Sequence, residues 1–193
     1  MNHYFSETQE SEFKLKKIKE VLNNKEYEFY TSKGVFSKNK VDYGTKVLVK
    51  YMKINPDDKV LDLGCGIGIV GRIASEKTKN KVLLTDINKR AVKLAKMNTK
   101  GRRNVHVIQG NMYEKIKEKF NVILLNPPQT AGKKICFQMI EDAKKFLLKN
   151  GSLQIIARHN KGGKTLSEYM ESIYGNMETI AKKGGYRVYV STT

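Results

Sequence analysis

The pattern of apolar and polar positions changes near residue 58, where Asn55, Pro56, Asp57 and Asp58 form a turn-rich stretch. Beyond it, short apolar runs alternate with amphipathic segments of helical length. We expect strands at residues 60–63, 82–85, 105–108, 122–125, 153–157 and 187–190, and helices at residues 68–76, 89–97, 134–148 and 164–173. This alternation predicts an α/β fold of the doubly wound class, with a mostly parallel sheet that carries helices on both faces.

Residues 1–58 form a predicted N-terminal extension, and residues 59–193 form the predicted core of a single domain. Within the extension, residues 10–22 place their apolar side chains close to one helical face and predict an amphipathic helix. Residues 27–36 are rich in aromatic side chains and predict a strand pair or an extended loop. Residues 45–52 return to a helical pattern.

A glycine-rich stretch, residues 62–71, continues from the first strand of the core. Glycines at this position let the backbone turn tightly and approach a ligand closely. The spacing fits two patterns: Gly64, Gly66 and Gly68 form G-x-G-x-G, whereas Gly66, Gly68 and Gly71 form the G-x-G-x-x-G of dinucleotide binding. The stretch therefore predicts a nucleotide-type cofactor but leaves its identity open.

Polar residues also follow the second and third strands of the core. Asp86 ends the second strand, where a carboxylate is placed to accept hydrogen bonds from ribose hydroxyls. A competing interpretation makes Asp86 the N-cap of the next helix, although Asn88 is also available for that role. After the third strand, Asn111 is a candidate to bind the exocyclic edge of an adenine, with Met112 or Ile87 against the ring.

The fourth strand of the core leads into Asn126-Pro127-Pro128-Gln129. Each proline fixes φ and removes a backbone donor, so carbonyl acceptors lie in a stiff geometry beside the Asn126 carboxamide. Such an array suits a substrate NH2 group, whose nitrogen lone pair it would aim at an electrophile. Positioning alone can then supply much of the rate acceleration. The alternative interpretation is a rigid turn that ends the strand.

Taken in order, these motifs resemble those of class I S-adenosylmethionine-dependent methyltransferases, in the branch that methylates planar or exocyclic nitrogens. The sequence is more closely similar to small archaeal proteins related to the catalytic domain of small-subunit ribosomal RNA guanine-N2 methyltransferases. That similarity runs from about Lys25 to the end of the chain and is carried by Gly34-Val35-Phe36-Ser37, Asp42 with Gly44-Thr45, Asn126-Pro127-Pro128 with Ala131-Gly132-Lys133, and Gly184-Gly185-Tyr186-Arg187-Val188.

The resemblance implies a Rossmann-like seven-stranded sheet whose last strand, near residues 186–191, is antiparallel. It also implies that Asp62 and the glycines hold the methionine part of the cofactor, Asp86 the ribose, Asn111 and Met112 the adenine, and Asn126-Pro127 the target amine. The sequence departs from the family at Asn111, where an aspartate is common, and at Gln129, where many relatives have an aromatic residue. Phe36 is our candidate for the missing stacking partner.

Charge adds a substrate class to this picture. The net charge is +18, of which residues 59–193 carry +16, and such an excess favours a polyanion such as nucleic acid. Adaptation to salt or temperature is the competing explanation, since 31 of the 37 basic residues are lysines. Lys133 and Lys134 follow the catalytic loop, where a phosphate beside a flipped base would lie. The charge favours a nucleic acid, and the resemblance implies that this partner is RNA, most of all ribosomal RNA.

Other side chains predict little further chemistry. His3, His106 and His159 are too scattered for a metal site, and Cys65 and Cys136 do not form a disulfide framework. The chain begins with a polar segment and contains no apolar run long enough to span a membrane, so we expect a cytoplasmic protein. The oligomeric state is left open.

Several alternative functions stay open on the sequence alone. A nicotinamide-dependent oxidoreductase could use Gly66, Gly68 and Gly71, but it leaves Asn126-Pro127-Pro128 unexplained. A noncatalytic RNA-binding module could retain the same fold. Among methyltransferases, adenine N6 and the amide N5 of a protein glutamine compete with guanine N2 as the target.

Overall fold

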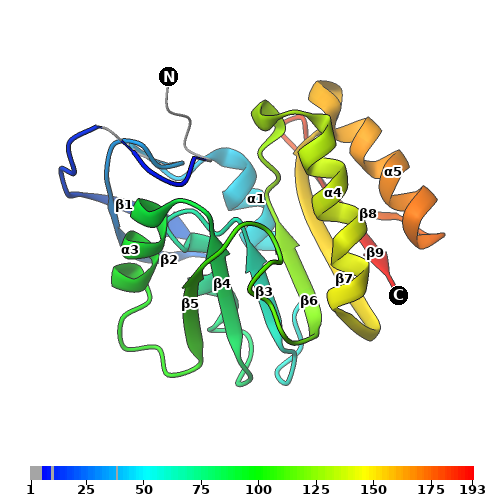
Figure 1. Ribbon diagram of the computed structural model, residues 1–193, viewed down its shortest axis with the longest axis horizontal. Coiled ribbons are helices and arrows are strands. Elements are labelled where there is room, and N and C mark those ends of the chain that lie inside the picture. Colours follow the sequence, from blue (N-terminus) through cyan, green and yellow to red (C-terminus); the bar gives the residue numbers. More distant parts are fainter. Residues whose placement is uncertain (1–5, 10, 38) are drawn as a thin grey trace.

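The computed structural model describes residues 6–9, 11–37 and 39–193. A seven-stranded sheet in the order β5-β4-β3-β6-β7-β9-β8 forms its centre (Figure 1). The first five strands of the sheet in sequence are parallel, namely β3 (Val60–Leu63), β4 (Val82–Asp86), β5 (Val105–Gln109), β6 (Phe120–Leu125) and β7 (Leu147–Arg158). The last strand, β9 (Tyr186–Thr192), is antiparallel to β7, as expected. The edge strand β8 (Glu178–Lys183), which the apolar pattern did not indicate, is antiparallel to β9.

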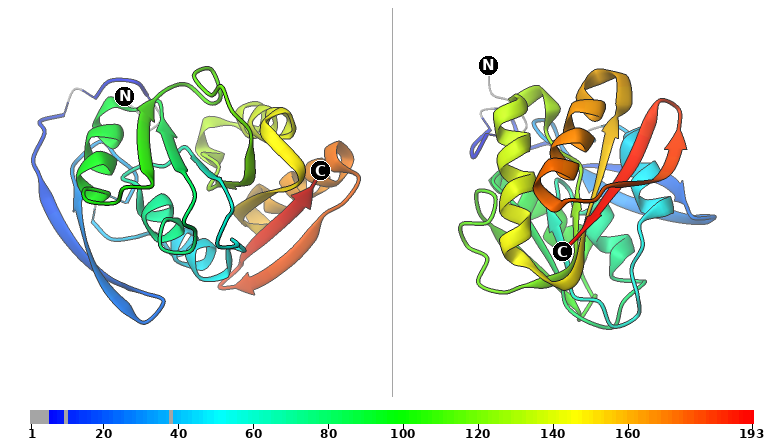
Figure 2. Two further views of the ribbon diagram at one scale, coloured as in Figure 1. Left: turned by 90° about the horizontal axis from the view of Figure 1, so that it is seen from below. Right: turned by 90° about the vertical axis from the view of Figure 1, so that its right-hand side faces the viewer.

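Helices cover both faces of the sheet, which confirms the doubly wound class (Figure 2). One face carries α1 (Tyr43–Tyr51), α2 (Ile69–Ala74) and α3 (Lys89–Asn98), and the other carries α4 (Lys133–Ala143) and α5 (Lys164–Tyr174). Alternate strand residues face opposite sides, so that Leu124 packs toward the first group of helices and Leu125 toward the second. Short helical turns lie at Gln129–Ala131, Lys144–Phe146 and His159–Gly163.

The order of the strands fixes where a ligand can enter. From β3 the chain proceeds to β4 and β5 on one side and then returns to place β6 on the other side of β3. In such sheets the connections leave the carboxyl ends of β3 and β6 in opposite directions and open a crevice between them. The residues that follow β3 and β6 therefore face the same space, although some 60 positions separate them in the sequence.

The helix expected at residues 10–22 is wrong: Lys16–Leu22 forms β1, which pairs with β2 (Lys25–Thr31) in an antiparallel hairpin. Glu10, where the expected helix began, lies outside the described residues. Asn23 and Asn24 connect the two strands with φ values of 50° and 63°. Two consecutive residues with positive φ are typical of a tight hairpin turn, which imposes a period of two on the flanking residues. Val21 consequently faces outward and is 64% exposed.

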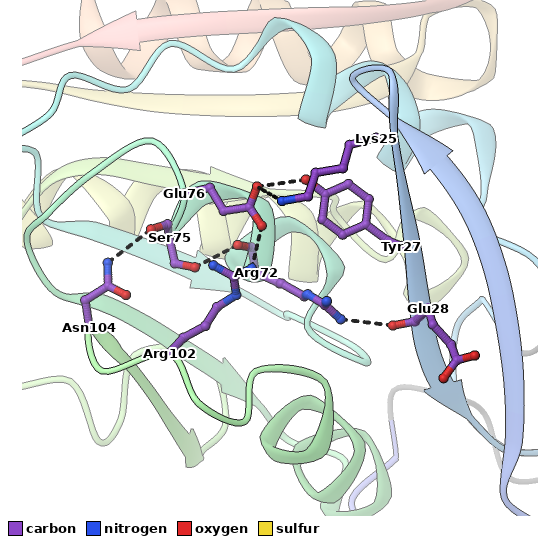
Figure 3. Close-up of polar contacts among 8 residues, drawn as sticks. All are labelled: Lys25, Tyr27, Glu28, Arg72, Ser75, Glu76, Arg102 and Asn104. Atoms are coloured by element: carbon purple, nitrogen blue, oxygen red, sulfur yellow. Dashed lines mark hydrogen bonds and ion pairs between the residues drawn. The ribbon is translucent and has the colours of Figure 1, made fainter.

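Polar contacts attach this hairpin to the end of α2 (Figure 3). The Glu76 carboxylate accepts a hydrogen bond of 2.8 Å from the Tyr27 hydroxyl and forms ion pairs with Lys25 and Arg102. Arg72 donates to the Glu28 carbonyl oxygen over 2.9 Å, and its guanidinium lies 5.4 Å from the centre of the Tyr27 ring. Burial and the Glu76 carboxylate raise the pKa of Tyr27 to about 12, so its hydroxyl remains a donor. No helix in the described ranges is long and apolar enough to cross a membrane.

Candidate active site

A pocket of about 460 Å³ opens at the crevice between the carboxyl ends of β3, β4 and β6. Residues from the extension and from the core contribute to it, because the segment before α1 closes one side. Most of the residues predicted for the site line this pocket. They are Phe36, Asp62, Gly64, Gly66, Asp86, Ile87, Asn111, Met112, Asn126, Pro127, Pro128 and Gln129.

Three predicted site residues, Gly68, Lys133 and Lys134, lie outside the lining of the pocket. Gly68 is the N-cap of α2 with φ +83°, and a Cβ there would lie 3.0 Å from the Cβ of Ala95. It therefore allows α2 and α3 to pack closely. Lys133 and Lys134 are exposed in the first turn of α4, next to the catalytic loop.

The glycines that do line the pocket adopt left-handed backbone conformations. Gly64 has φ +68° and Gly66 has φ +54°, and a Cβ at Gly66 would meet no atom within 4 Å. Their conformation, rather than lack of space, is what favours glycine here. Gly71, the third glycine of the dinucleotide pattern, packs instead: its Cβ would lie 2.5 Å from Leu84 Cγ. Packing against Leu84 thus explains why residue 71 is a glycine, without a contact between Gly71 and a dinucleotide.

Two carboxylates form the floor of the pocket: that of Asp62, which is buried, and that of Asp86, which is partly buried. Asp62 accepts a hydrogen bond of 2.7 Å from the Gly71 amide, and Asp86 accepts one of 2.8 Å from the Gly66 amide. Burial raises the pKa of Asp62 to about 7, and burial also raises the pKa of Asp86. Within the described part of the chain, neither carboxylate has a lysine or arginine as an ion-pair partner. A cationic ligand would therefore find unneutralised acceptors.

Asp86 does not cap the helix that follows it. Asn88 is the N-cap of α3, and its side-chain oxygen accepts from the amides of Arg90 and Ala91. Asp86 is thus held at the floor by backbone amides, which include that of Asn88 at 2.8 Å. Next to it, the Thr85 hydroxyl is buried, lines the pocket and makes no hydrogen bond within the described residues. A buried hydroxyl without a partner is typical of a site built for a polar ligand.

A chain of hydrogen bonds orients the Asn126 carboxamide. The Thr45 hydroxyl donates its proton to Asp42, which is also the N-cap of α1. Since that hydroxyl has only one proton, its oxygen can only accept from Asn126, whose Nδ2 lies 3.2 Å away. The NH2 end of Asn126 is thereby turned toward Thr45, and Oδ1 is left as an acceptor beside the pocket.

The prolines after Asn126 form the start of a short helical turn. The Pro127 carbonyl accepts from the Gln129 amide and the Pro128 carbonyl from the Ala131 amide, each at 2.8 Å. Each carbonyl oxygen retains a second lone pair. The Gln129 side chain reaches away from the turn and donates to the Lys161 carbonyl over 3.1 Å. Gln129 therefore supplies no aromatic ring on which a substrate base could stack.

Sequence reasoning assigned no role to three residues that line the pocket: Asp42, Thr45 and Tyr186. An aspartate just before a helical pattern is a helix-start signal, which would indicate Asp42 as a cap but gives no sign of the contact between Thr45 and Asn126. Tyr186 follows a glycine pair at the beginning of β9, and no local pattern ties it to the pocket. No group of three or more His, Cys, Asp or Glu residues that could hold a metal ion occurs among residues 6–9, 11–37 and 39–193. His3 lies outside the described residues.

Comparisons with known proteins agree with this geometry. The methyltransferase small domain family matches residues 26–190. The uncharacterized protein YbxB of Bacillus subtilis (strain 168) is 31% identical over 192 residues, which cover 96% of each chain. Ribosomal RNA small subunit methyltransferase C of Hamiltonella defensa subsp. Acyrthosiphon pisum (strain 5AT) is 30% identical, over 87% of this chain and 51% of the relative. This chain thus spans about half the length of that relative.

Among solved structures, the 16S rRNA N2 G1207 methyltransferase RsmC of T. thermophilus, in complex with AdoMet and guanosine, superimposes with a TM-score of 0.79. It is 18% identical in sequence, and the match covers 95% of this chain and 51% of that one. The likeness confirms the expected Rossmann-like fold. The family match extends over most of the chain and confirms the expectation of an enzyme that uses S-adenosylmethionine. The chain belongs to the methyltransferase small domain family and is an S-adenosylmethionine-dependent methyltransferase.

Proposed function

We propose that this enzyme methylates an exocyclic amine of RNA, with N2 of a guanine in ribosomal RNA as the target. One observation carries the proposal: the Asp42–Thr45–Asn126 chain leaves the Asn126 Oδ1 acceptor beside the pocket. An acceptor in a fixed position suits an NH2 group. The names of two proteins similar to this chain, a small-subunit ribosomal RNA methyltransferase and a guanine N2 methyltransferase, support the substrate. We also propose that the enzyme acts in the cytoplasm, where ribosomal RNA is found.

The pocket fits the cofactor. S-adenosylmethionine supplies an electrophilic methyl group on a positively charged sulfur. The unneutralised carboxylates of Asp62 and Asp86 complement that charge, and Gly64 and Gly66 allow a close approach of the backbone. We assign Asp62 and the glycines to the methionine part and Asp86 to the ribose. Ile87, Asn111 and Met112 are assigned to the adenine.

The residues of this chain orient the amine rather than ionise it. Asn126 Oδ1 and the second lone pair of the Pro127 carbonyl would accept the two N–H groups of the target. Held in this way, the nitrogen directs its lone pair away from the loop. An exocyclic amine loses a proton readily once it has formed a fourth bond, so water can remove that proton. A constellation of this kind accelerates the reaction mainly by positioning the amine.

The substrate class follows from charge. Lys133 and Lys134 are exposed beside the catalytic loop, in a core that carries +16 of the net charge. Phosphates attract such side chains, whereas a protein glutamine or a free base would not require them. We therefore favour RNA over a protein amide as the source of the NH2 group. Phe36 lines the pocket on the side of the extension, and we keep it as a candidate to contact the base.

The test uses radiolabelled S-adenosylmethionine and an unmodified transcript of small-subunit ribosomal RNA, followed by digestion to nucleosides. We expect label in N2-methylguanosine. Asn126→Ala should lower the transfer rate by about 100-fold, the scale of a single electrostatic interaction removed from the transition state, and should leave cofactor affinity within a few fold. Label in N6-methyladenosine or in a protein fraction would contradict the assigned target. Full activity of Asn126→Ala would contradict the role of that residue.

A further inference from the structure

A strip of unpaired cations borders the pocket beside β7. Arg158 is the last residue of β7, Lys161 lies in the turn that follows it, and Lys182, Lys183 and Arg187 flank the turn between β8 and β9. We call these five residues the cationic rim. Within the described residues, none of them forms an ion pair. Positive charges that no carboxylate of the described chain neutralises are available to an anionic ligand.

The two turns of the rim are bonded to each other, so the five cations gather at one end of the sheet. The His159 amide donates to the Gly185 carbonyl over 2.9 Å, and Arg158 is directly opposite Tyr186 in the β7–β9 register. Burial lowers the pKa of His159, and Arg187, Lys164 and Lys182 lower it further, which reflects how densely cations gather here. The rim is also joined to the catalytic loop, since Gln129 donates to the Lys161 carbonyl.

An aromatic side chain lies where the rim meets the pocket. Tyr186 lines the pocket together with Asn126 and Pro127. The Arg158 guanidinium lies 5.9 Å from the centre of the Tyr186 ring, and the centre of the Tyr43 ring lies 5.8 Å from it. Gly44 packs so closely that a Cβ there would lie 2.8 Å from Tyr186 Cε1. The ring is thus fixed from several directions, and Tyr43 beside it is 50% exposed.

We propose that the cationic rim docks the RNA strand that carries the target base, and that Tyr186 is the ring on which this base stacks. The inference rests on the proposed function, because it takes RNA as the substrate. Cations interleaved with aromatic rings are the pattern of single-stranded nucleic-acid sites, in which lysine and arginine bind phosphates and rings stack on bases. Tyr186 supplies what Gln129 lacks, an aromatic ring in the pocket that Asn126 also lines.

The rim is tested by removing charge from it and from a matched surface. The rim variant carries Lys161→Gln, Lys182→Gln and Lys183→Gln. The control carries Lys79→Gln, Lys100→Gln and Lys119→Gln; these exposed lysines precede β4, β5 and β6, and so lie at the opposite edge of the sheet. Both variants lose the same net charge, so that only the position of the charge differs between them.

Binding of a short, fluorescein-labelled single-stranded RNA is measured by anisotropy at several salt concentrations. Each phosphate that a variant no longer neutralises should lower the slope of log affinity against log salt by about 0.7, so the slope should fall by about 2 in the rim variant and hardly at all in the control. Equal slopes for the two variants would overturn the proposal. Binding of a polyglutamate peptide as tight and as dependent on the rim lysines as that of the RNA would also overturn it, in favour of an acidic protein partner.

Tyr186 is tested by a signal that does not depend on catalysis. The chain contains no tryptophan, so Tyr186→Trp places a single indole at the proposed stacking site. RNA should quench its fluorescence, whereas Tyr43→Trp, farther out, should be quenched less. In methyl transfer, Tyr186→Leu should lower kcat/KM by about 5- to 150-fold, the range of one base–aromatic stack, and Tyr186→Phe should restore it. Cofactor affinity should stay within about twofold, since the substitution removes no group assigned to the cofactor.

The outcomes separate the two proposals. If RNA binds through the rim and quenches the indole but no methyl group is transferred, the proposed function fails and the docking surface stands. If RNA is methylated while the rim variant and Tyr186→Leu behave like the wild type, the proposed function stands and the docking surface is wrong. An indole that RNA leaves unquenched at saturating concentration would also exclude stacking on residue 186.

Discussion

Charged side chains form ion pairs at one end of the molecule, whereas those of the pocket floor and the cationic rim form none among the described residues. At the hairpin of β1 and β2, acidic and basic side chains neutralise one another: Lys17 pairs with Glu28 at 2.7 Å and Lys19 with Glu26 at 3.7 Å. Glu76 forms ion pairs with both Lys25 and Arg102 (Figure 3). At the pocket, the floor carboxylates and the cationic rim have no ion-pair partners in the described chain. The hairpin and strands β8 and β9 lie at opposite ends of the molecule (Figure 2).

The difference separates charges that hold the fold together from charges that are available to ligands. The floor is negative and the rim is positive, so the pocket suits two ligands of opposite sign at adjacent places. A cationic cofactor complements Asp62 and Asp86, and a polyanion complements the rim. Net charge by itself does not reveal this arrangement. Of the +18, residues 1–58 contribute only +2, because the extension balances its own charges.

The largest effect that we expect concerns the floor, which should make the stability of the fold depend on pH between about 4 and about 7. The pKa of Asp62 is about 7 in the fold, above the usual value of 3.8. Protonated Asp62 contributes fully to the free energy of unfolding below about pH 4. This contribution, on the order of 4 kcal/mol, is lost as pH rises through about 7. Asp62→Asn stays neutral, and its side-chain oxygen can still accept from Gly71.

Urea unfolding of the cofactor-free protein checks this prediction. The free energy of unfolding of Asp62→Asn, relative to that of the wild type, should rise steadily between about pH 4 and about pH 7. Asp58→Asn serves as the control, because it removes a carboxylate from the turn before β3, away from the floor of the pocket. If the free energies of unfolding of Asp62→Asn and wild type changed in parallel with pH across this range, ionisation of Asp62 would not destabilise the fold.

A smaller effect is expected from Thr45, which connects the fold to the chemistry. Thr45→Val keeps the shape of the side chain but removes both the acceptor of Asn126 Nδ2 and the donor to Asp42. The carboxamide can then turn, so kcat should fall by roughly 10- to 100-fold, the equivalent of one or two hydrogen bonds. KM for the cofactor should change little, and Thr45→Ser should restore the rate.

A purely structural role for Thr45 would give a different result. Removal of the hydrogen bond to Asp42 or of the methyl group would then lower the melting temperature of both variants, without a selective decrease of kcat in Thr45→Val. Steady-state kinetics and thermal unfolding of the same preparations distinguish the two cases. An unchanged kcat in a folded Thr45→Val protein would remove Thr45 from the positioning chain.

Sequence reasoning succeeded where topology brings residues together. Asp62, Asp86 and Asn126 each lie at the end of a short apolar run or just after it, and parallel strands place the ends of such runs at one edge of the sheet. The identity of the individual side chains was then enough to predict a pocket with carboxylates and an amide in it. The resemblance to a known family added the seventh strand, which the apolar pattern of residues 178–183 did not indicate.

The β1–β2 hairpin and the roles of Thr45 and Tyr186 depend on contacts between segments, which the pattern within one segment does not indicate. Residues 10–22 fit a helical face, but Asn23 and Asn24 form a turn that pairs β1 with β2, and pairing decided the conformation. The two asparagines were the available signal. Thr45 lies 81 positions from Asn126, and Tyr186 reaches the pocket only because β9 runs beside β7. Contacts of this kind depend on how distant elements pack against each other.

The smallest effect, a change in RNA affinity, is expected from the hairpin. It gives the sharpest test of the contrast between paired and unpaired cations. Lys17→Gln with Lys19→Gln removes two exposed cations whose charge is already balanced by Glu28 and Glu26. RNA affinity should therefore stay within about twofold of the wild type, because an exposed ion pair contributes little and the phosphates gain no free cation from this surface. Anisotropy with the same labelled RNA measures it. If the hairpin variant weakened RNA binding as much as loss of the rim lysines, paired and unpaired cations would be equivalent, and the contrast between the two ends would have no functional meaning.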